Sequence, residues 1–237
     1  MTAPVSGGTR LAVPRLLVPA YFHPAVRPDD WALLAARAAQ VRLVILNLAN
    51  GPGTRPDEAC LPSLERLRAA GVGVIGYVDT NYGRRPPHEA MVEFGHYLDW
   101  YGVSGVLFDQ VAAAPELVSH FAALARGVRS MGARVVVFNH GIYPPEAYAD
   151  HADVLGTFEG PWSSYRDVAL PGWARSWPAD HFYHVVHSVP RQHLGDAYEL
   201  ASRRRAGCAY VTDRSGGNPY DQLPADWPDP GGLNPGT

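Results

Sequence analysis

Short apolar runs alternate with helix-like segments along most of the chain. Eight of these runs have the length and composition of buried strands: Leu16–Phe22, Leu43–Leu48, Val72–Asp79, Gly105–Asp109, Arg134–Asn139, Val154–Glu159, Phe182–His187 and Ala209–Asp213. Between them, the helical pattern of Asp57–Ala70 stops at Gly71 and that of Pro115–Met131 stops at Gly132, and helices often end at glycine. Eight such strand–helix units predict the α/β class, as a single (β/α)8 TIM barrel.

The chain length agrees with this prediction, because 237 residues is close to the ~250 that such a barrel needs. A doubly wound open sheet is the alternative. However, the first strand is followed by Tyr21-Phe22-His23-Pro24 and not by a glycine-rich phosphate loop. We therefore expect one barrel domain over residues 15–222, preceded by a flexible segment (1–14) and followed by a Pro/Gly-rich tail (223–237).

Polar side chains stand where the predicted strands end. They are Asn47, Asp79, Asp109, Asn139, Glu159 and Asp213. Side chains two apart on a strand share a face, so an axial Asp109 places Leu107 beneath it. The same parity places Thr157 and Leu155 beneath Glu159. Barrel enzymes carry their chemistry at the C-terminal ends of the strands, so these residues predict an active-site rim.

Asp109 and Glu159 are the expected catalytic pair. Two carboxylates facing one cleft suit glycoside hydrolysis, in which one protonates the leaving oxygen and the other acts as nucleophile or base. Aromatic rings near the rim suit sugar faces, while amide and charged groups bond to hydroxyls. The expected substrate-binding residues are Tyr21, Asn47, Tyr77, Asp79, Tyr82, Arg85, Gln110, Asn139, Trp162 and Asp213. Helix capping, salt bridges and core packing are the structural alternatives for these positions.

Composition narrows the possible partners. The net charge of −3 argues against nucleic acid or an anionic membrane as a partner, and no stretch approaches the ~20 apolar residues of a membrane span. The two cysteines, Cys60 and Cys208, lack the spacing of zinc ligands, so we expect no metal and no cofactor. No signal sequence is visible, which favours the cytoplasm by default, or secretion if a leader has been lost. The oligomeric state is left open.

Several motifs in order resemble the spherulin-4-like (spherulation-specific family 4) proteins. The resemblance runs from about Val18 to Trp227. It rests on Pro19-Ala20-Tyr21, on Asn50-Gly51-Pro52-Gly53, on the block from Gly76 to Arg85, on Gly105 to Asp109, on Phe158-Glu159 and on Asn218-Pro219-Tyr220-Asp221. These proteins are related to barrel glycoside hydrolases that cleave α-1,4-linked galactosamine or N-acetylgalactosamine polymers. The resemblance implies a (β/α)8 barrel, a carbohydrate partner and an acidic site.

The family pattern has adjacent Asp and Glu after the fourth strand and a further Glu after the sixth. Asp109 and Glu159 match the first and third, but Gln110 replaces the middle one. The Asn-Pro-Gly after the fifth strand is also altered, to Asn139-His140-Gly141. Glutamine cannot exchange a proton, so a non-catalytic carbohydrate-binding protein is the alternative to a hydrolase. A metal-dependent barrel hydrolase is a third hypothesis. For an amino-sugar substrate, Asp79 and Asp213 are the expected partners of an ammonium group.

Overall fold

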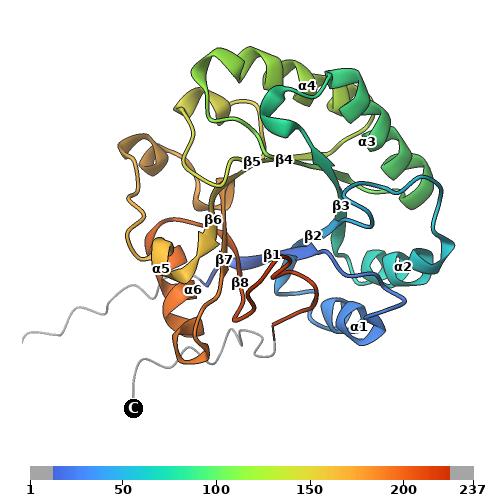
Figure 1. Ribbon diagram of the computed structural model, residues 1–237, viewed down its shortest axis with the longest axis horizontal. Coiled ribbons are helices and arrows are strands. Elements are labelled where there is room, and N and C mark those ends of the chain that lie inside the picture. Colours follow the sequence, from blue (N-terminus) through green and yellow to red (C-terminus); the bar gives the residue numbers. More distant parts are fainter. Residues whose placement is uncertain (1–12, 225–237) are drawn as a thin grey trace, which may run out of the picture.

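A computed structural model describes residues 13–224 as eight parallel strands closed into a barrel in sequence order (Figure 1). The strands are β1 (Arg15–Ala20), β2 (Val41–Leu46), β3 (Gly73–Asp79), β4 (Gly105–Asp109), β5 (Val135–Asn139), β6 (Val154–Pro161), β7 (Phe182–His187) and β8 (Cys208–Val211). Each predicted strand is present, with ends shifted by up to two residues. The barrel fold predicted from the sequence is therefore confirmed.

Helices cover the outside of the barrel unevenly (Figure 1). They are α1 (Pro28–Ala36), α2 (Leu61–Ala69), α3 (Pro87–Tyr101), α4 (Val118–Ser130), α5 (Trp162–Tyr165) and α6 (Leu194–Arg203). Between β5 and β6 the chain forms only a 3-10 turn, Glu146–Tyr148, after Pro144-Pro145. The helix ring is therefore thin beside β5 and β6, where α5 is a single turn.

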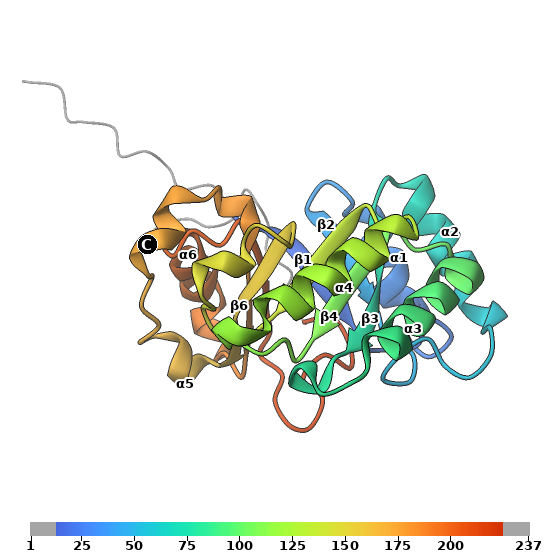
Figure 2. The same ribbon diagram turned by 90° about the horizontal axis from the view of Figure 1, so that it is seen from above.

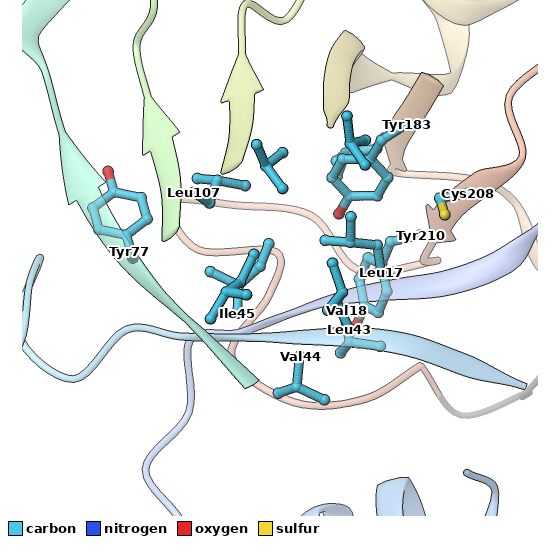
Figure 3. Close-up of a cluster of buried hydrophobic side chains, with 14 of the residues drawn as sticks. Leu17, Val18, Leu43, Val44, Ile45, Tyr77, Leu107, Tyr183, Cys208 and Tyr210 are labelled. Atoms are coloured by element: carbon cyan, nitrogen blue, oxygen red, sulfur yellow. The ribbon is translucent and has the colours of Figure 1, made fainter. Parts of the chain in front are cut away.

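The barrel interior is filled by apolar and aromatic side chains from successive strands (Figure 3). The register pairs Tyr77 with Leu107 and Asp79 with Asp109, so the acidic residues lie one layer above apolar ones. On the opposite face of the strands, the Phe138 ring lies 5.8 Å from the Phe121 ring of α4. The alternation predicted for β3 and β4 is thus confirmed, and it aims Asp109 at the barrel axis.

The alternation predicted for β6 is wrong. The pairing of β6 with β7 shifts between Gly156 and Phe158, which marks a β-bulge. Thr157 Oγ1 lies 3.1 Å from His184 Nε2, and His184 also contacts Tyr165 of α5, so Thr157 faces the helices. Gly156 takes the inward position next to β5 instead. The extra residue at the bulge is what returns Glu159 to the inside.

Most of the predicted flexible segment 1–14 and of the predicted tail 223–237 lies outside the described residues. Leu223 is described, and it is buried in the core. Within residues 13–224, no helix is both long enough and apolar enough to cross a membrane.

Gly105 offers a test of the strand spacing. A Cβ at this position would lie 2.1 Å from the Val135 carbonyl oxygen of the paired strand. Because neither backbone can yield, we expect Gly105→Ala to lower the free energy of unfolding by about 1–3 kcal/mol in urea denaturation. The control is Gly172→Ala, whose Cβ would meet nothing within 4 Å. Equal stability of the two variants would contradict the close pairing of β4 with β5.

Candidate active site

One amide joins the two predicted catalytic carboxylates. Asn139 Nδ2, at the end of β5, donates to Asp109 Oδ1 at 2.8 Å and to Glu159 Oε2 at 2.6 Å. A side-chain amide nitrogen carries two N–H groups, so Asn139 donates one of them to each carboxylate. Three neighbouring strands, β4, β5 and β6, thus place one group each at the same point.

Two tyrosines complete the shell around the carboxylates. The Tyr77 hydroxyl of β3 donates to Asp109 Oδ2 at 2.8 Å, and the Tyr220 hydroxyl donates to Glu159 Oε1 at 2.8 Å. Each of the four carboxylate oxygens therefore accepts a hydrogen bond. Burial and the nearby carboxylates raise the pKa of both tyrosines, so both hydroxyls stay protonated and act as donors.

The carboxyl of Glu159 has a raised pKa. Burial, followed by the negative charge of Asp109, raises its pKa, while the hydrogen bonds from Asn139 and Tyr220 oppose that rise. Protein atoms surround the carboxyl, yet the side chain retains access to solvent. An accessible carboxyl with a raised pKa suits the donation of a proton to a bound molecule.

Tyr21 lies between the two donor tyrosines. Its ring meets Tyr77 at 5.5 Å and Tyr220 at 5.6 Å, edge to face in both cases. Burial and the charges of Asp109 and Glu159 raise its pKa. Within residues 13–224 its hydroxyl has no hydrogen-bond partner, so it is available to a bound molecule. The stacking on a sugar face that the sequence analysis expects of this ring stays a prediction.

The position of Asn139 depends on Gly156 of the neighbouring strand. A Cβ at Gly156 would lie 2.4 Å from Asn139 Oδ1, so only glycine leaves room for the amide there.

His140, the residue after Asn139, packs its ring against Tyr148 at 4.6 Å and hydrogen-bonds through Nδ1 to the Val111 carbonyl. Burial lowers the pKa of His140 to about 4, so the ring is neutral near pH 7. The residue that departs from the family pattern here is therefore a loop anchor.

Gln110 stands beside the carboxylate pair and not within it. Its backbone adopts φ 52°, a left-handed conformation that is uncommon outside glycine. Its side-chain amide nitrogen lies 3.4 Å from Asp79 Oδ2. Its backbone carbonyl accepts hydrogen bonds from the Thr80 hydroxyl and from the Tyr82 backbone N–H. No described contact joins Gln110 to the carboxyl of Asp109 or of Glu159. The pair is thus assembled without a carboxylate at position 110.

Asp79 and Arg85 border a separate polar cavity of about 470 Å³. Its lining consists of Asn50, Asp79, Asn81, Arg84, Arg85, Pro86, Glu89 and Glu93. Arg85 pairs with Glu93 at 2.5 Å and donates to the Asp79 carbonyl at 3.0 Å. Asp79 Oδ1 accepts from the Asn81 backbone at 2.6 Å. The structure thus groups these two predicted binding residues beside Gln110.

The other predicted binding residues have separate partners. Asn47 accepts from the Gly51 backbone at 3.1 Å, Trp162 stacks on His193 at 6.0 Å, and Asp213 pairs with Arg191 at 3.0 Å. Tyr82 is 53% exposed, at a left-handed φ of 55°.

The predicted set omits Tyr220, although this residue lies within the motif Asn218-Pro219-Tyr220-Asp221. That motif is the signal that could have identified it.

A possible metal-binding group lies on the loops after β1 and β2, where His23, Asp57 and Cys60 place ligand atoms within 4.8 Å of one another. His23 Nδ1 accepts from the Ala25 backbone at 3.1 Å, and Nε2 lies 2.9 Å from Asp57 Oδ2. In a neutral imidazole the second nitrogen then carries the proton, so Nε2 donates to Asp57. Burial raises the pKa of the Cys60 thiol to about 12. These contacts fit a hydrogen-bonded cluster, and the expected absence of a metal stays a prediction.

Comparison with known proteins identifies the family. The model of spherulation-specific family 4 matches residues 15–230. The chain belongs to this family. Spherulin-4 of Physarum polycephalum is 26% identical over an alignment 215 positions long, and the alignment covers 86% of this chain and 64% of that protein. The present chain therefore spans slightly less than two thirds of the length of spherulin-4. The family predicted from the sequence motifs is confirmed.

Solved structures share the barrel. Aspergillus clavatus Sph3 in complex with GalNAc has a TM-score of 0.77 at 22% identity, covering 91% of this chain and 95% of that one. The C-terminal domain of a putative chitinase from Desulfitobacterium hafniense has 0.55 at 12% identity, covering 74% and 67%. Deoxyribose phosphate aldolase from Aeropyrum pernix has 0.52 at 15%, covering 83% and 85%. Such different proteins on one fold mean that function has to be argued from the site.

The environment of Gln110 gives a test that needs no substrate. In Gln110→Glu, a second carboxylate would face Asp79, and like charges raise the pKa of such a pair in the folded state. The variant should then melt below Gln110→Met at pH 7, and the difference should shrink as the pH falls through the raised pKa of the pair and vanish below about 4, where the carboxyls are protonated in the unfolded chain as well. A difference in melting temperature that does not vary with pH would contradict the proximity of Gln110 to Asp79.

Proposed function

We propose that this protein is a glycoside hydrolase that cleaves an α-1,4-linked polymer of galactosamine or N-acetylgalactosamine. The observation that carries the proposal is the Asn139-bridged pair of Asp109 and Glu159 at the C-terminal end of the barrel strands. Family membership and the GalNAc complex of the structural neighbour Sph3 support the choice of sugar.

The two carboxylates take different roles in this proposal. Glu159, whose pKa is raised, donates a proton to the glycosidic oxygen as the bond to the anomeric carbon breaks. Asp109 attacks the anomeric carbon as the nucleophile. Water then hydrolyses the resulting glycosyl ester while Glu159 takes a proton back from it. The free hydroxyl of Tyr21 supplies a hydrogen bond to the sugar from the same side of the barrel.

The Asn139 bridge favours retention of configuration. The two bonded carboxylate oxygens can be no farther apart than the two hydrogen bonds laid end to end, at 2.8 Å and 2.6 Å. These two oxygens are thus closer together than the carboxyl groups of inverting glycosidases, which stand ~6.5–9.5 Å apart to leave room for a water molecule.

Among the expected partners of an ammonium group, Asp79 is the better placed. Asp213 already pairs with Arg191 at 3.0 Å. No cationic side chain in the described part of the chain pairs with the Asp79 carboxylate. An unneutralised carboxylate at the rim suits a deacetylated amino sugar, whose ammonium would supply the missing charge.

A non-catalytic carbohydrate-binding protein is the second candidate, and Gln110 is the observation that favours it. The contacts of the catalytic pair argue the other way, because they do not involve position 110. Measuring binding and turnover on the same polymer separates the two functions. Binding without turnover in the wild type, together with hydrolysis gained in Gln110→Glu, would establish the second candidate.

Removing either carboxylate tests the proposed pair. We expect Asp109→Asn and Glu159→Gln each to lower the release of reducing ends from a galactosamine polymer by about 10²–10⁴-fold, since each removes a group that acts in the transition state. The matched controls are Asp196→Asn and Glu199→Gln on α6, where both side chains are exposed. Full activity in either active-site variant would refute the assignment.

The stereochemical outcome is a separate prediction. Proton NMR of the reaction, recorded before mutarotation, should show that the new reducing end first appears in the α configuration of the cleaved linkage. Initial appearance of the β anomer would rule out Asp109 as the nucleophile and would require a wider separation of the carboxylates.

A further inference from the structure

The chain after β8 reaches back to the carboxylate pair. We call residues 212–224 the C-terminal strap, and Figure 2 shows this red segment looping out at one end of the barrel. It carries Tyr220, which is 7% exposed and whose hydroxyl lies 2.8 Å from Glu159 Oε1. A residue from outside the barrel strands therefore supplies one of the two hydrogen bonds that Glu159 accepts.

Separate contacts fix the strap close to Tyr220. Arg214 forms two hydrogen bonds to Asp221, at 2.7 Å and 3.1 Å. Asn218 accepts from the Tyr220 backbone at 3.0 Å and donates to the Tyr21 carbonyl at 3.3 Å. The turn that presents Tyr220 is thus held on both sides, by an ion pair within the strap and by a bond to the end of β1.

The far end of the strap is tied to the first helix of the barrel. The Leu223 backbone donates to Asp30 of α1 at 3.3 Å, and Arg27 donates to the side chain of Gln222. The Tyr220 ring also packs against Tyr21 at 5.6 Å and Tyr210 at 6.1 Å. These anchors leave the tyrosine little freedom to swing away from Glu159.

We propose that Tyr220, presented by the C-terminal strap, is a positioning residue that holds the Glu159 carboxyl in its working orientation and stabilises its charged form. This inference rests on the proposed function for its catalytic meaning, although the contact itself does not. A hydroxyl that donates to a carboxylate favours the ionised state, so Tyr220 offsets part of the effect of burial and of Asp109. The strap thereby keeps the pKa of the proton donor from rising further.

The other titratable groups around Glu159 are the same in the wild type and in the variants described below, so they do not account for a difference in the titration of Glu159. The titratable groups that face it are Asp109 from β4, Tyr21 after β1, Tyr77 from β3, Tyr183 from β7 and Tyr220 itself. Burial and neighbouring negative charge raise the pKa of all four tyrosines, so their hydroxyls stay protonated while the Glu159 carboxyl is titrated.

The test is a pH titration of the Glu159 carboxyl by carbon NMR in the full chain, with Glu159→Gln used to assign the signal. In Tyr220→Phe we expect the midpoint to rise by about one pH unit or more, because a hydrogen bond to a charged group is lost. The control is Tyr148→Phe, which removes a buried hydroxyl bonded to the Ala114 carbonyl at 2.7 Å and leaves Glu159 untouched. An unchanged or lowered midpoint in Tyr220→Phe overturns the proposal.

A second variant distinguishes a specific effect on Glu159 from a general folding defect. Asp221→Asn weakens the ion pair with Arg214 and leaves the Tyr220 hydroxyl in place, so we expect a smaller upward shift of the same midpoint. An unshifted midpoint in both Tyr220→Phe and Asp221→Asn would exclude a role for the strap.

Activity provides the final comparison. In Tyr220→Phe the alkaline limb of the plot of kcat against pH should move to higher pH. The value of kcat should fall about tenfold, with KM little changed. If the wild type shows no turnover, the proposed function fails, while the NMR titration still decides the role of Tyr220. A change confined to KM would overturn the positioning role.

Discussion

The amide of Asn139 is the constraint on which the site depends. Two carboxylates brought close together repel each other, and burial penalises their charge further. By donating one N–H to Asp109 and the other to Glu159, a single neutral group offsets both effects without adding a charge. The arrangement leaves Glu159 with a raised pKa, and no cationic side chain among residues 13–224 pairs with its carboxylate. That is the balance that a proton donor requires.

The barrel supplies the geometry for this bridge. Closure of the sheet places the ends of β3 to β6 side by side, so that Tyr77, Asp109, Asn139 and Glu159 converge from four consecutive strands. Gly156 leaves space for the amide, and the bulge after it turns Glu159 inward. Groups held in place by a rigid scaffold stabilise developing charge without first having to reorganise. The C-terminal strap adds a further contact from beyond β8, the hydrogen bond from Tyr220 to Glu159.

Much of this architecture was predictable because it depends on local patterns. Eight apolar runs identified the strands, and the polar residues at their ends identified Asp109, Asn139 and Glu159. Alternation correctly aimed Asp109 inward, since β4 is regular. It failed at Thr157 because a bulge depends on pairing with the next strand, which a single run of residues does not reveal. The contact of Tyr220 with Glu159 was not predicted for a similar reason, since the two residues lie 61 positions apart in the sequence.

The departures from the family pattern now have physical interpretations. Gln110 gives Asp79 an amide neighbour and takes no part in the carboxylate shell, while His140 is a neutral loop anchor. The positions that differ are therefore outside the contacts that define the proposed chemistry. The change at position 110 therefore leaves the contacts of the proposed catalytic pair intact.

The most direct test is the pKa of the Glu159 carboxyl in the wild-type protein, measured by carbon NMR without any ligand. We expect a midpoint clearly above the ordinary value for glutamate of about 4.3. A midpoint at or below that value would contradict the claim that Glu159 is held as a proton donor beside Asp109.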